Sequence, residues 1–469
     1  MLPKRKHAKS ARLAAALLIA LSPLVWLAGP AQPAAAETAD LTNTDVQFQS
    51  GALTLYGTVV APTAAGTGRA GLVLVPGAGA RTRDAYRPEA EAFARAGVVV
   101  LIYDKRSDYS RATSSFTRLA DDAIAGVHLL RSRADVEPSR VGIWGHSEGG
   151  WVAPLAASRS TDIGFVIPVG ASALHTDRTQ LWSNRTYLSH AGVSASLWDP
   201  IGVNLSRMLV AANLFGDVGY DPIATLQKVH QPLLAVFGQY DRSTVPAESL
   251  RLYRDALDRA GNTHYTLRVI PDANHNMRRS TTGFDNAHAS RFAPGYTDLI
   301  TSWINDLGHT LPEASADPPP GQNLPSTPVK PLAWFENVAL QLGLLAVMLI
   351  GFLAYPVGAV LRRLRRHRPP ARVRWAARLL AASGMITVLG TSTYLFTIVA
   401  TGATNTTTTL LGRPPEWLTL QLGALGVLAT TAFTIIGCRR HGGSPRVGLL
   451  LTGGVVFIPW AAYWGLLTP

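Results

Sequence analysis

Four long apolar segments in the C-terminal third constrain this chain more than any other feature of its sequence. Each is 20 to 24 residues long and contains no Asp, Glu, Lys, Arg or His. A helix of about 20 apolar residues spans the hydrocarbon layer of a bilayer, whereas a helix on the surface of a soluble domain keeps a polar face. We therefore predict that the region 332–469 is an all-α transmembrane bundle, with helices at 338–361, 379–400, 418–437 and 447–467.

The loops between these segments predict the orientation of the bundle. Seven arginines and no acidic residue lie in 362–375, and three arginines lie in 439–446, whereas 401–417 has Arg413 as its single basic residue. Positively charged loops stay in the cytoplasm. The first and third loops are thus expected inside, and the residues that precede the first helix are expected outside.

The N-terminus independently predicts the same orientation. Residues 1–36 contain five basic residues, then an apolar stretch, then the small residues Ala34, Ala35 and Ala36. This order is typical of a secretory signal peptide and its cleavage site. A cleaved signal peptide is our first interpretation, and an uncleaved signal anchor is the alternative. Both predict a multi-pass protein of the cell membrane whose remaining domain is extracytoplasmic.

The charge distribution favours a membrane protein over a nucleic-acid-binding protein. The net charge is +13, of which residues 1–36 carry +5 and 330–469 carry +11, while 37–329 carry −3. Basic residues that flank apolar segments are expected at a membrane surface. We therefore expect the lipid bilayer as a partner and no nucleic acid. Ionisable residues mark transport pathways at membrane depth, so their absence from the four segments favours an anchor, or a module that binds a membrane partner, over a transporter.

Residues 37–310 alternate short apolar runs with amphipathic stretches. This alternation predicts an α/β domain with a doubly wound, mostly parallel sheet that helices cover on both faces. The segment 171–230 is too long for an ordinary connection and predicts a helical cap. Its apolar side chains could face a substrate or form a small core of their own, and the sequence leaves both open. The expected strands are 72–75, 98–103, 141–144, 165–169, 233–237 and 266–270, after a hairpin over 46–61.

A proline-rich segment joins the two regions. Residues 311–331 contain seven prolines. Such a segment cannot form a helix and favours an extended, semi-rigid spacer. We therefore expect a linker that separates the α/β domain from the membrane.

One glycine-rich motif predicts a nucleophile. The strand 141–144 runs directly into Gly145-His146-Ser147-Glu148-Gly149, and a helix is expected to follow. A sharp strand–turn–helix connection of this kind exposes a serine hydroxyl above the sheet and directs backbone N–H groups toward a reacting carbonyl. The alternative is a serine that only caps the helix. The context favours Ser147 as a nucleophile.

A serine nucleophile needs a base, and the base needs a carboxylate that orients it. Asp241 follows the strand 233–237, and His275 follows the strand 266–270 and precedes the last helix of the domain. Their order after Ser147 is the one this architecture requires. Asp272 is a rival acid, although its place three residues before His275 is more typical of a turn. We predict Ser147, Asp241 and His275 as the catalytic residues.

An oxyanion hole is expected beside the serine. In this arrangement one N–H group comes from the residue after the nucleophile and another from the loop after the third strand. These criteria select Glu148 and, in the loop 76–80, Ala78, although an ordinary strand–helix turn would look the same. This chemistry needs no metal and no organic cofactor.

These motifs resemble those of a known superfamily. GHSEGG at 145–150, FGQYD at 237–241 and Asn274-His275 are similar to the α/β-hydrolase superfamily, and YDKR at 103–106 is similar to its dienelactone hydrolase and S9/S33 serine peptidase branches. The resemblance covers about residues 45–310. It implies the α/β-hydrolase fold with a helical cap and a serine hydrolase that acts on a small-molecule acyl substrate.

The sequence thus suggests a membrane-anchored extracytoplasmic serine hydrolase that cleaves an ester, thioester or amide through an acyl-enzyme. Two alternatives stay open. One is a non-catalytic membrane scaffold or sensor whose hydrolase-like domain only binds. The other is an acyltransferase that uses the same residues and passes the acyl group to an envelope lipid or glycan.

Overall fold

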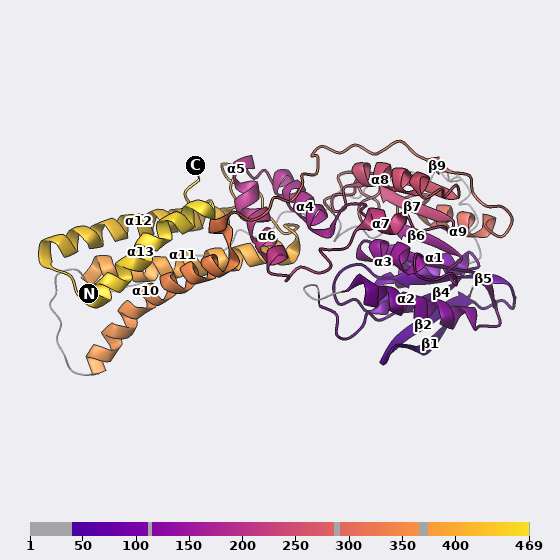
Figure 1. The fold of residues 1–469 in the computed structure, drawn as a ribbon, viewed down its shortest axis with the longest axis horizontal. Coiled ribbons are helices and arrows are strands. Elements are labelled where there is room, and N and C mark those ends of the chain that lie inside the picture. Colours follow the sequence, from indigo (N-terminus) through magenta and orange to yellow (C-terminus); the bar gives the residue numbers. More distant parts are fainter. Residues whose placement is uncertain (1–39, 111–114, 286–290, 365–373, 469) are drawn as a thin grey trace, which may run out of the picture. The chain divides into compact units, whose positions relative to one another are not determined.

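The computed structural model describes residues 40–110, 115–285, 291–364 and 374–468. The expected signal peptide lies outside these residues. A nine-stranded sheet organises the first domain (Figure 1). Its strands lie in the order β1 (Leu41–Ser50), β2 (Leu53–Pro62), β4 (Val99–Tyr103), β3 (Arg69–Val75), β5 (Val136–His146), β6 (Phe165–Val169), β7 (Leu233–Gly238), β8 (Tyr265–Ile270) and β9 (Ser315–Ala316).

The sheet is mostly parallel, as predicted. The hairpin β1–β2 is antiparallel, β2 pairs antiparallel with β4, and every later pair is parallel. Because side chains alternate between the two faces of a strand, a strand that is apolar throughout must be covered on both sides. In β3, Leu72 and Leu74 belong to one buried core, while Val73 and Val75 belong to another.

Helices cover both faces of this sheet (Figure 1). On one face lie α1 (Arg87–Arg95) and α9 (Tyr296–Asp306), which share a core with Leu72 and Leu74. On the other face lie α2 (Phe116–Arg131), α3 (Glu148–Ala157) and α8 (Pro246–Arg259). This is the doubly wound α/β arrangement expected from the sequence.

The strand order creates a crevice at one edge of the sheet. The chain passes from β3 to β4 on one side of β3 and then returns to β5 on the other side. Open α/β sheets bind ligands outside the carboxyl ends of their strands at such a reversal. The loop after β3 and the turn after β5 therefore meet where a ligand is expected.

An insertion of helices separates β6 from β7. It contains α4 (Thr176–His190), α5 (Ala195–Trp198), a π-helical turn (Asp199–Val203), α6 (Asn204–Ala211) and α7 (Pro222–Leu226). We refer to residues 171–230 as the insertion. Its apolar side chains Leu188, Leu197 and Ile201 are buried, and they pack in one core with Phe352 and Trp460 of the C-terminal helices. Much of its apolar surface therefore packs against those helices.

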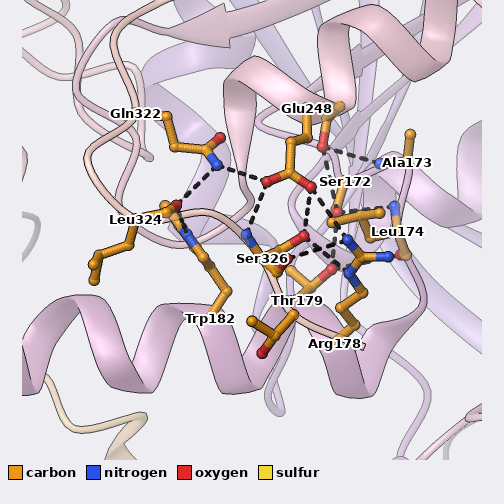
Figure 2. A network of polar contacts seen from close by, with 12 residues as sticks. Ser172, Ala173, Leu174, Arg178, Thr179, Trp182, Glu248, Gln322, Leu324 and Ser326 are labelled. Carbon is orange, nitrogen blue, oxygen red and sulfur yellow. Dashed lines mark hydrogen bonds and ion pairs between the residues drawn. The ribbon is translucent and has the colours of Figure 1, made fainter. Parts of the chain in front are cut away.

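The proline-rich segment is extended, but it follows the α/β domain closely. Ser315 and Ala316 form β9 and extend the sheet beside β8. Farther along, Glu248 of α8 accepts hydrogen bonds from Gln322 Nε2 and from the backbone N–H of Ser326, both at 2.8 Å (Figure 2). The indole of Trp182 donates to Leu324 O at 2.7 Å. The expected spacer is thus fastened to α4 and α8.

Four helices follow the proline-rich segment. They are α10 (Val338–Leu364), α11 (Arg374–Thr401), α12 (Pro415–His441) and α13 (Pro445–Tyr463). Each is long and apolar enough to cross a membrane. This finding supports association with a membrane, as the apolar segments predicted.

Polar contacts join the α/β domain to one end of these helices. Arg207 of α6 forms a two-point ion pair with Glu336, with N–O distances of 2.8 and 2.9 Å, just before α10 begins. Tyr463 at the end of α13 also donates to Glu336. Between α11 and α12, Thr409 donates to Gly192 O at 3.1 Å. The ends of the helices that contact the domain are the ones that the arginine-rich loops predict to be outside.

Candidate active site

Ser147 lies on a strained turn between β5 and α3. Its φ and ψ are 56° and −113°, a region that non-glycine residues rarely occupy and that costs about 1–3 kcal/mol. The turn has no room for side chains on either side. A Cβ at Gly145 would lie 2.0 Å from Gly149 O, and a Cβ at Gly149 would lie 2.2 Å from Val75 O. The glycines of the motif therefore allow the close packing that places Ser147 above the sheet.

The structure brings the three predicted catalytic residues together. The Ser147 hydroxyl lies 3.0 Å from His275 Nε2, and His275 Nδ1 lies 2.9 Å from Asp241 Oδ2. The two distances are within hydrogen-bond range, which is the geometry that proton transfer from a serine requires. Asp272, the rival acid, instead occupies a turn with φ 53°, and its carbonyl accepts from Ser280 N–H.

Asp241 is fully buried and held as a carboxylate acceptor. Oδ1 accepts from the backbone N–H groups of Ser243 and Thr244, and Oδ2 accepts from the Thr244 hydroxyl at 2.6 Å as well as from His275. Burial by itself would raise the pKa of Asp241. The positive charge of a protonated His275 and these hydrogen bonds outweigh burial, so the pKa lies below its ordinary value. An ionised Asp241 fixes the orientation of the His275 ring.

The loop after β3 lies against Ser147. Ala78 lines the same cavity as Ser147 and Glu148. The N–H of Gly77 donates to the Tyr86 hydroxyl at 2.8 Å, and the N–H of Gly79 donates to the Tyr109 hydroxyl at 3.1 Å. The two tyrosines thus hold the loop on both sides of Ala78, and neither uses the Ala78 N–H.

A buried ion pair beside the oxyanion loop was not predicted from the sequence. Lys105 Nζ donates to Glu148 Oε1 at 2.5 Å and to Gly77 O at 2.7 Å. The Tyr109 hydroxyl donates to Glu148 Oε2 at 2.9 Å. Both charged side chains are less than a tenth exposed. Lys105 therefore connects the residue after the nucleophile to the loop that carries Ala78. Lys105 belongs to the YDKR motif at 103–106, and Tyr109 follows this motif. The motif was the sequence feature that could have indicated these two residues.

His146 and Tyr86 form a second unpredicted support. Tyr86 OH lies 3.0 Å from His146 Nδ1, and His146 Nε2 lies 3.0 Å from His275 O. A carbonyl only accepts, so Nε2 carries the proton and Nδ1 accepts from Tyr86. Burial, assisted by the charge of His275, lowers the pKa of His146 to about 3 and keeps the ring neutral. This chain of bonds links the oxyanion loop to the backbone of the proposed base.

Two cavities meet at Ser147. The first has a volume of about 430 Å³, and His275, Glu89 and Arg278 line it. The second has a volume of about 220 Å³, and Phe116 and Trp151 line it. Ala78, Ser147, Ser243 and Thr404 line both. A substrate bound across Ser147 could place one part in each cavity. In the described part of the chain, no group of three or more His, Cys, Asp or Glu side chains is arranged to hold a metal ion.

The sheet order and the strand–turn–helix around Ser147 define an α/β-hydrolase fold, as the motif resemblance predicted. Within this fold, residues 86–293 match the sequence model of the prolyl oligopeptidase family, a group of S9 peptidases. The match begins at Tyr86 and includes Ser147, Asp241 and His275. It supports a hydrolase.

The chain is similar to several solved structures at low sequence identity. A dienelactone hydrolase from Anabaena variabilis is 19% identical, over 58% of this chain and 99% of its own, with a TM-score of 0.37. The Pyrococcus furiosus esterase Pf2001 is 16% identical, over 57% and 91%, with a TM-score of 0.38. The Pyrococcus horikoshii acylaminoacyl peptidase is 18% identical, over 59% and 43%, with a TM-score of 0.38. No curated protein sequence matches the chain.

Proposed function

We propose that this protein is a membrane-anchored serine hydrolase that cleaves an ester, thioester or amide through an acyl-enzyme. The observation that carries the proposal is the line of hydrogen bonds from Ser147 Oγ through His275 to Asp241, at 3.0 and 2.9 Å. A neutral imidazole at this distance can accept the serine proton while the hydroxyl oxygen attacks a carbonyl.

Each residue has a definite role in this mechanism. Ser147 forms a bond to the carbonyl carbon, and His275 takes the serine proton and passes it to the leaving group. Asp241 holds the ring and stabilises its protonated form. The N–H groups of Ala78 and Glu148 stabilise the negative charge on the carbonyl oxygen. Water, deprotonated by His275, then attacks the acyl-enzyme and releases the acid, which restores Ser147.

Active-site labelling tests the catalytic proposal. A fluorophosphonate probe reacts with a serine whose proton a neighbouring base removes. We expect the full-length protein to be labelled and the Ser147→Ala variant to remain unlabelled. Ser139→Ala is the matched control. Ser139 is exposed on the domain surface, so this variant should be labelled at Ser147 as the wild type is. A folded wild type that is not labelled would favour the binding-only scaffold.

The same proposal places the α/β domain outside the cytoplasm. Arg362 and Arg363 of the loop 362–375, and Arg439 and Arg440 of the loop 439–446, lie in the last turns of α10 and α12. These helix ends are opposite to the contacts of Glu336 and Thr409 with the domain. Positive loops remain inside. We therefore expect the domain and the two loops to face opposite sides of the membrane.

Cysteine accessibility tests this orientation. In a Cys438→Ser background, Glu313→Cys places a thiol on an exposed residue beside the domain, and Ser444→Cys places one in the loop before α13. In intact cells, a membrane-impermeant maleimide should label the first variant and should label the second only after lysis. The reverse pattern would place the domain in the cytoplasm and overturn this part of the proposal.

A further inference from the structure

The proposed site shares its walls with a membrane-spanning helix. Ala400, Thr401 and Gly402, at the end of α11, line the smaller cavity together with Ser147. With 28 residues, α11 is about 42 Å long, whereas the hydrocarbon layer is about 30 Å thick. Arginines flank the other end of α11, so the proposed orientation puts its Thr401 end at the outer headgroup layer. In this orientation the cavity that Ser147 shares with the end of α11 is expected near the lipid headgroups.

A separate apolar cavity lies deeper along the same helix. Its volume is about 200 Å³, and residues of α6 in the insertion and of α10, α11 and α13 line it. None of the described residues that line it carries a charged side chain. Since three of its four walls are membrane-spanning helices, hydrocarbon chains of the bilayer are its natural surroundings. Its lining includes Leu205, Leu209, Leu345, Leu395, Phe396 and Trp460.

The apolar cavity and the smaller cavity at Ser147 are neighbours. Leu214 lines the apolar cavity, and the next residue, Phe215, lines the cavity at Ser147. Along α11, Phe396 lines the apolar cavity and Ala400 lines the smaller cavity at Ser147. These two residues are one helical turn apart, a rise of about 6 Å. An extended acyl chain that leaves the smaller cavity past Phe215 and along α11 would enter the apolar cavity.

The position of His275 decides which part of a substrate enters each cavity. The group that protonates the leaving group must lie next to it. His275 lines the larger cavity and is absent from the lining of the smaller one. The leaving group thus belongs in the larger cavity and the acyl group in the smaller one, on the side of α11.

The larger cavity is suited to a polar leaving group. Arg81 lines it, and so does the ion pair of Arg278 with the buried Glu89 at 2.7 Å. Glu89 Oε2 is buried and has no hydrogen-bond partner among the described residues. An unpaired buried acceptor favours a ligand that brings a hydrogen-bond donor. A hydroxyl-bearing leaving group meets this requirement.

We infer that the substrate of the proposed hydrolase is an amphiphile of the outer membrane surface, in which a long acyl chain is esterified to a polar, hydroxyl-bearing group. The acyl chain occupies the apolar cavity and the polar group the larger cavity. Ser147 Oγ bonds to the carbonyl carbon, the ester C–O bond breaks, and His275 transfers the serine proton to the departing oxygen. Water then releases a fatty acid. This inference rests on the proposed function.

Chain-length dependence of hydrolysis tests the inference. Full-length protein in nanodiscs is assayed with p-nitrophenyl butanoate and p-nitrophenyl dodecanoate below their aggregation limits. Each methylene buried adds about 0.8 kcal/mol, or roughly fourfold in kcat/KM. We expect kcat/KM for the dodecanoate to exceed that for the butanoate by at least tenfold. Equal values, or a preference for the butanoate, would overturn the inference and leave the hydrolase intact.

A pair of neighbouring alanines provides a matched variant and control. Ala212 lines the apolar cavity, whereas Ala211 is exposed and does not line it. Ala212→Trp fills the cavity, so the dodecanoate-to-butanoate ratio of kcat/KM should fall at least tenfold, while Ala211→Trp should keep the wild-type ratio. An equal dodecanoate-to-butanoate ratio in both variants would show that the acyl chain does not enter this cavity.

A covalent probe tests the same point in the wild-type protein. A fluorophosphonate with a dodecyl chain that ends in a photoreactive diazirine is expected to label Ser147 and then, on irradiation, to crosslink to the helices that line the apolar cavity, α6, α10, α11 or α13. Crosslinks elsewhere would overturn the inference. Failure of every ester to react, together with absence of Ser147 labelling, would instead contradict the proposed function itself.

Discussion

At the scale of single residues, the site depends on buried polar groups around the proposed catalytic residues. His146 and Lys105 do not reach the reacting atoms in the proposed mechanism, but they hold elements that do. His146 Nε2–H donates to the backbone of His275, and Lys105 bonds Gly77 O and Glu148. Buried polar groups in such networks are costly to leave unpaired. Their removal is therefore expected to appear in stability measurements.

His146 makes the stability of the protein sensitive to acid. Burial lowers its pKa to about 3 in the folded state, against about 6.5 in the unfolded chain. As the pH falls through this interval, the unfolded chain binds a proton that the folded chain does not. The contribution of His146 is thus fully present above pH 6.5 and is lost toward pH 3, by up to about 1.4 kcal/mol per pH unit.

Replacing His146 is expected to flatten this dependence. Between pH 6.5 and 5.0, the free energy of unfolding of His146→Gln should fall by about 1.6 kcal/mol less than that of the wild type. Chemical unfolding of the full chain in detergent, followed by tryptophan fluorescence, measures the difference, and all other titrating groups are common to both proteins. Parallel curves would show that folding does not lower the pKa of His146.

The pair Lys105–Glu148 is expected to be strongly coupled. Because both side chains are buried, Lys105→Met leaves the carboxylate of Glu148 without its cation, at a cost of about 3–5 kcal/mol. Glu148→Gln added to Lys105→Met removes the uncompensated charge. The double variant should therefore be more stable than the Lys105→Met single variant, as measured by thermal unfolding. Additive losses in a double-mutant cycle would contradict a direct interaction.

The residues that the sequence predicted and those that it did not differ in a physical respect. Ser147, Asp241 and His275 each follow a recognisable strand, so their position at one edge of the sheet could be inferred from strand order. Lys105 also follows a strand, but its partner Glu148 lies 43 residues away, and nothing in either local pattern links them. Such pairing depends on tertiary contacts that a single sequence does not display.

At the scale of elements, the sheet and its helices could be predicted because the central strands β4, β6 and β7 are apolar on both faces. The behaviour of the proline-rich segment could not. Proline content predicts an extended backbone, and the segment is extended, but its attachment depends on Glu248, which lies 78 residues before Ser326. Glu248 and Arg178 both bond Ser326, and Trp182 bonds Leu324 (Figure 2). The proline content of a segment does not indicate such contact partners.

Glu248 is expected to fasten this segment to the domain. Its Oε1 accepts from Ser326 N–H, and a hydrogen bond to a charged group contributes about 1.5–3 kcal/mol. Glu248→Ala should therefore accelerate hydrogen exchange of the Ser326 amide at least tenfold, as measured by mass spectrometry of the full chain. Glu313→Ala is the matched control, because Glu313 is an exposed glutamate of the same segment and should leave this exchange unchanged. Equal protection in both variants would mean that other contacts hold the segment.

At the scale of the whole molecule, the α/β domain and the membrane helices share a hydrophobic core in addition to the proline-rich segment that connects them. Leu188, Leu197 and Ile201 of the insertion are at most 1% exposed, and their core includes Phe352 and Trp460. A domain on a simple spacer would have a polar surface there. The C-terminal helices therefore cover an apolar face of the insertion. This agrees with the smaller cavity at Ser147, whose lining includes the end of α11.

This arrangement predicts that the α/β domain is unstable without the bundle. A fragment of residues 40–330 exposes apolar side chains whose burial contributes about 1.5–3 kcal/mol each. We expect the fragment to bind a hydrophobic dye, to self-associate in size-exclusion chromatography, and to unfold at a lower temperature than the full chain in detergent.

The double substitution Leu197→Gln and Ile201→Gln should have opposite effects on the fragment and on the full chain. It should make the fragment more soluble, since the side chains then face water, and it should lower the thermal stability of the full chain, since they then face an apolar core. A fragment that is monomeric and as stable as the full chain would show that the domain folds independently, and that the shared core contributes little to its stability.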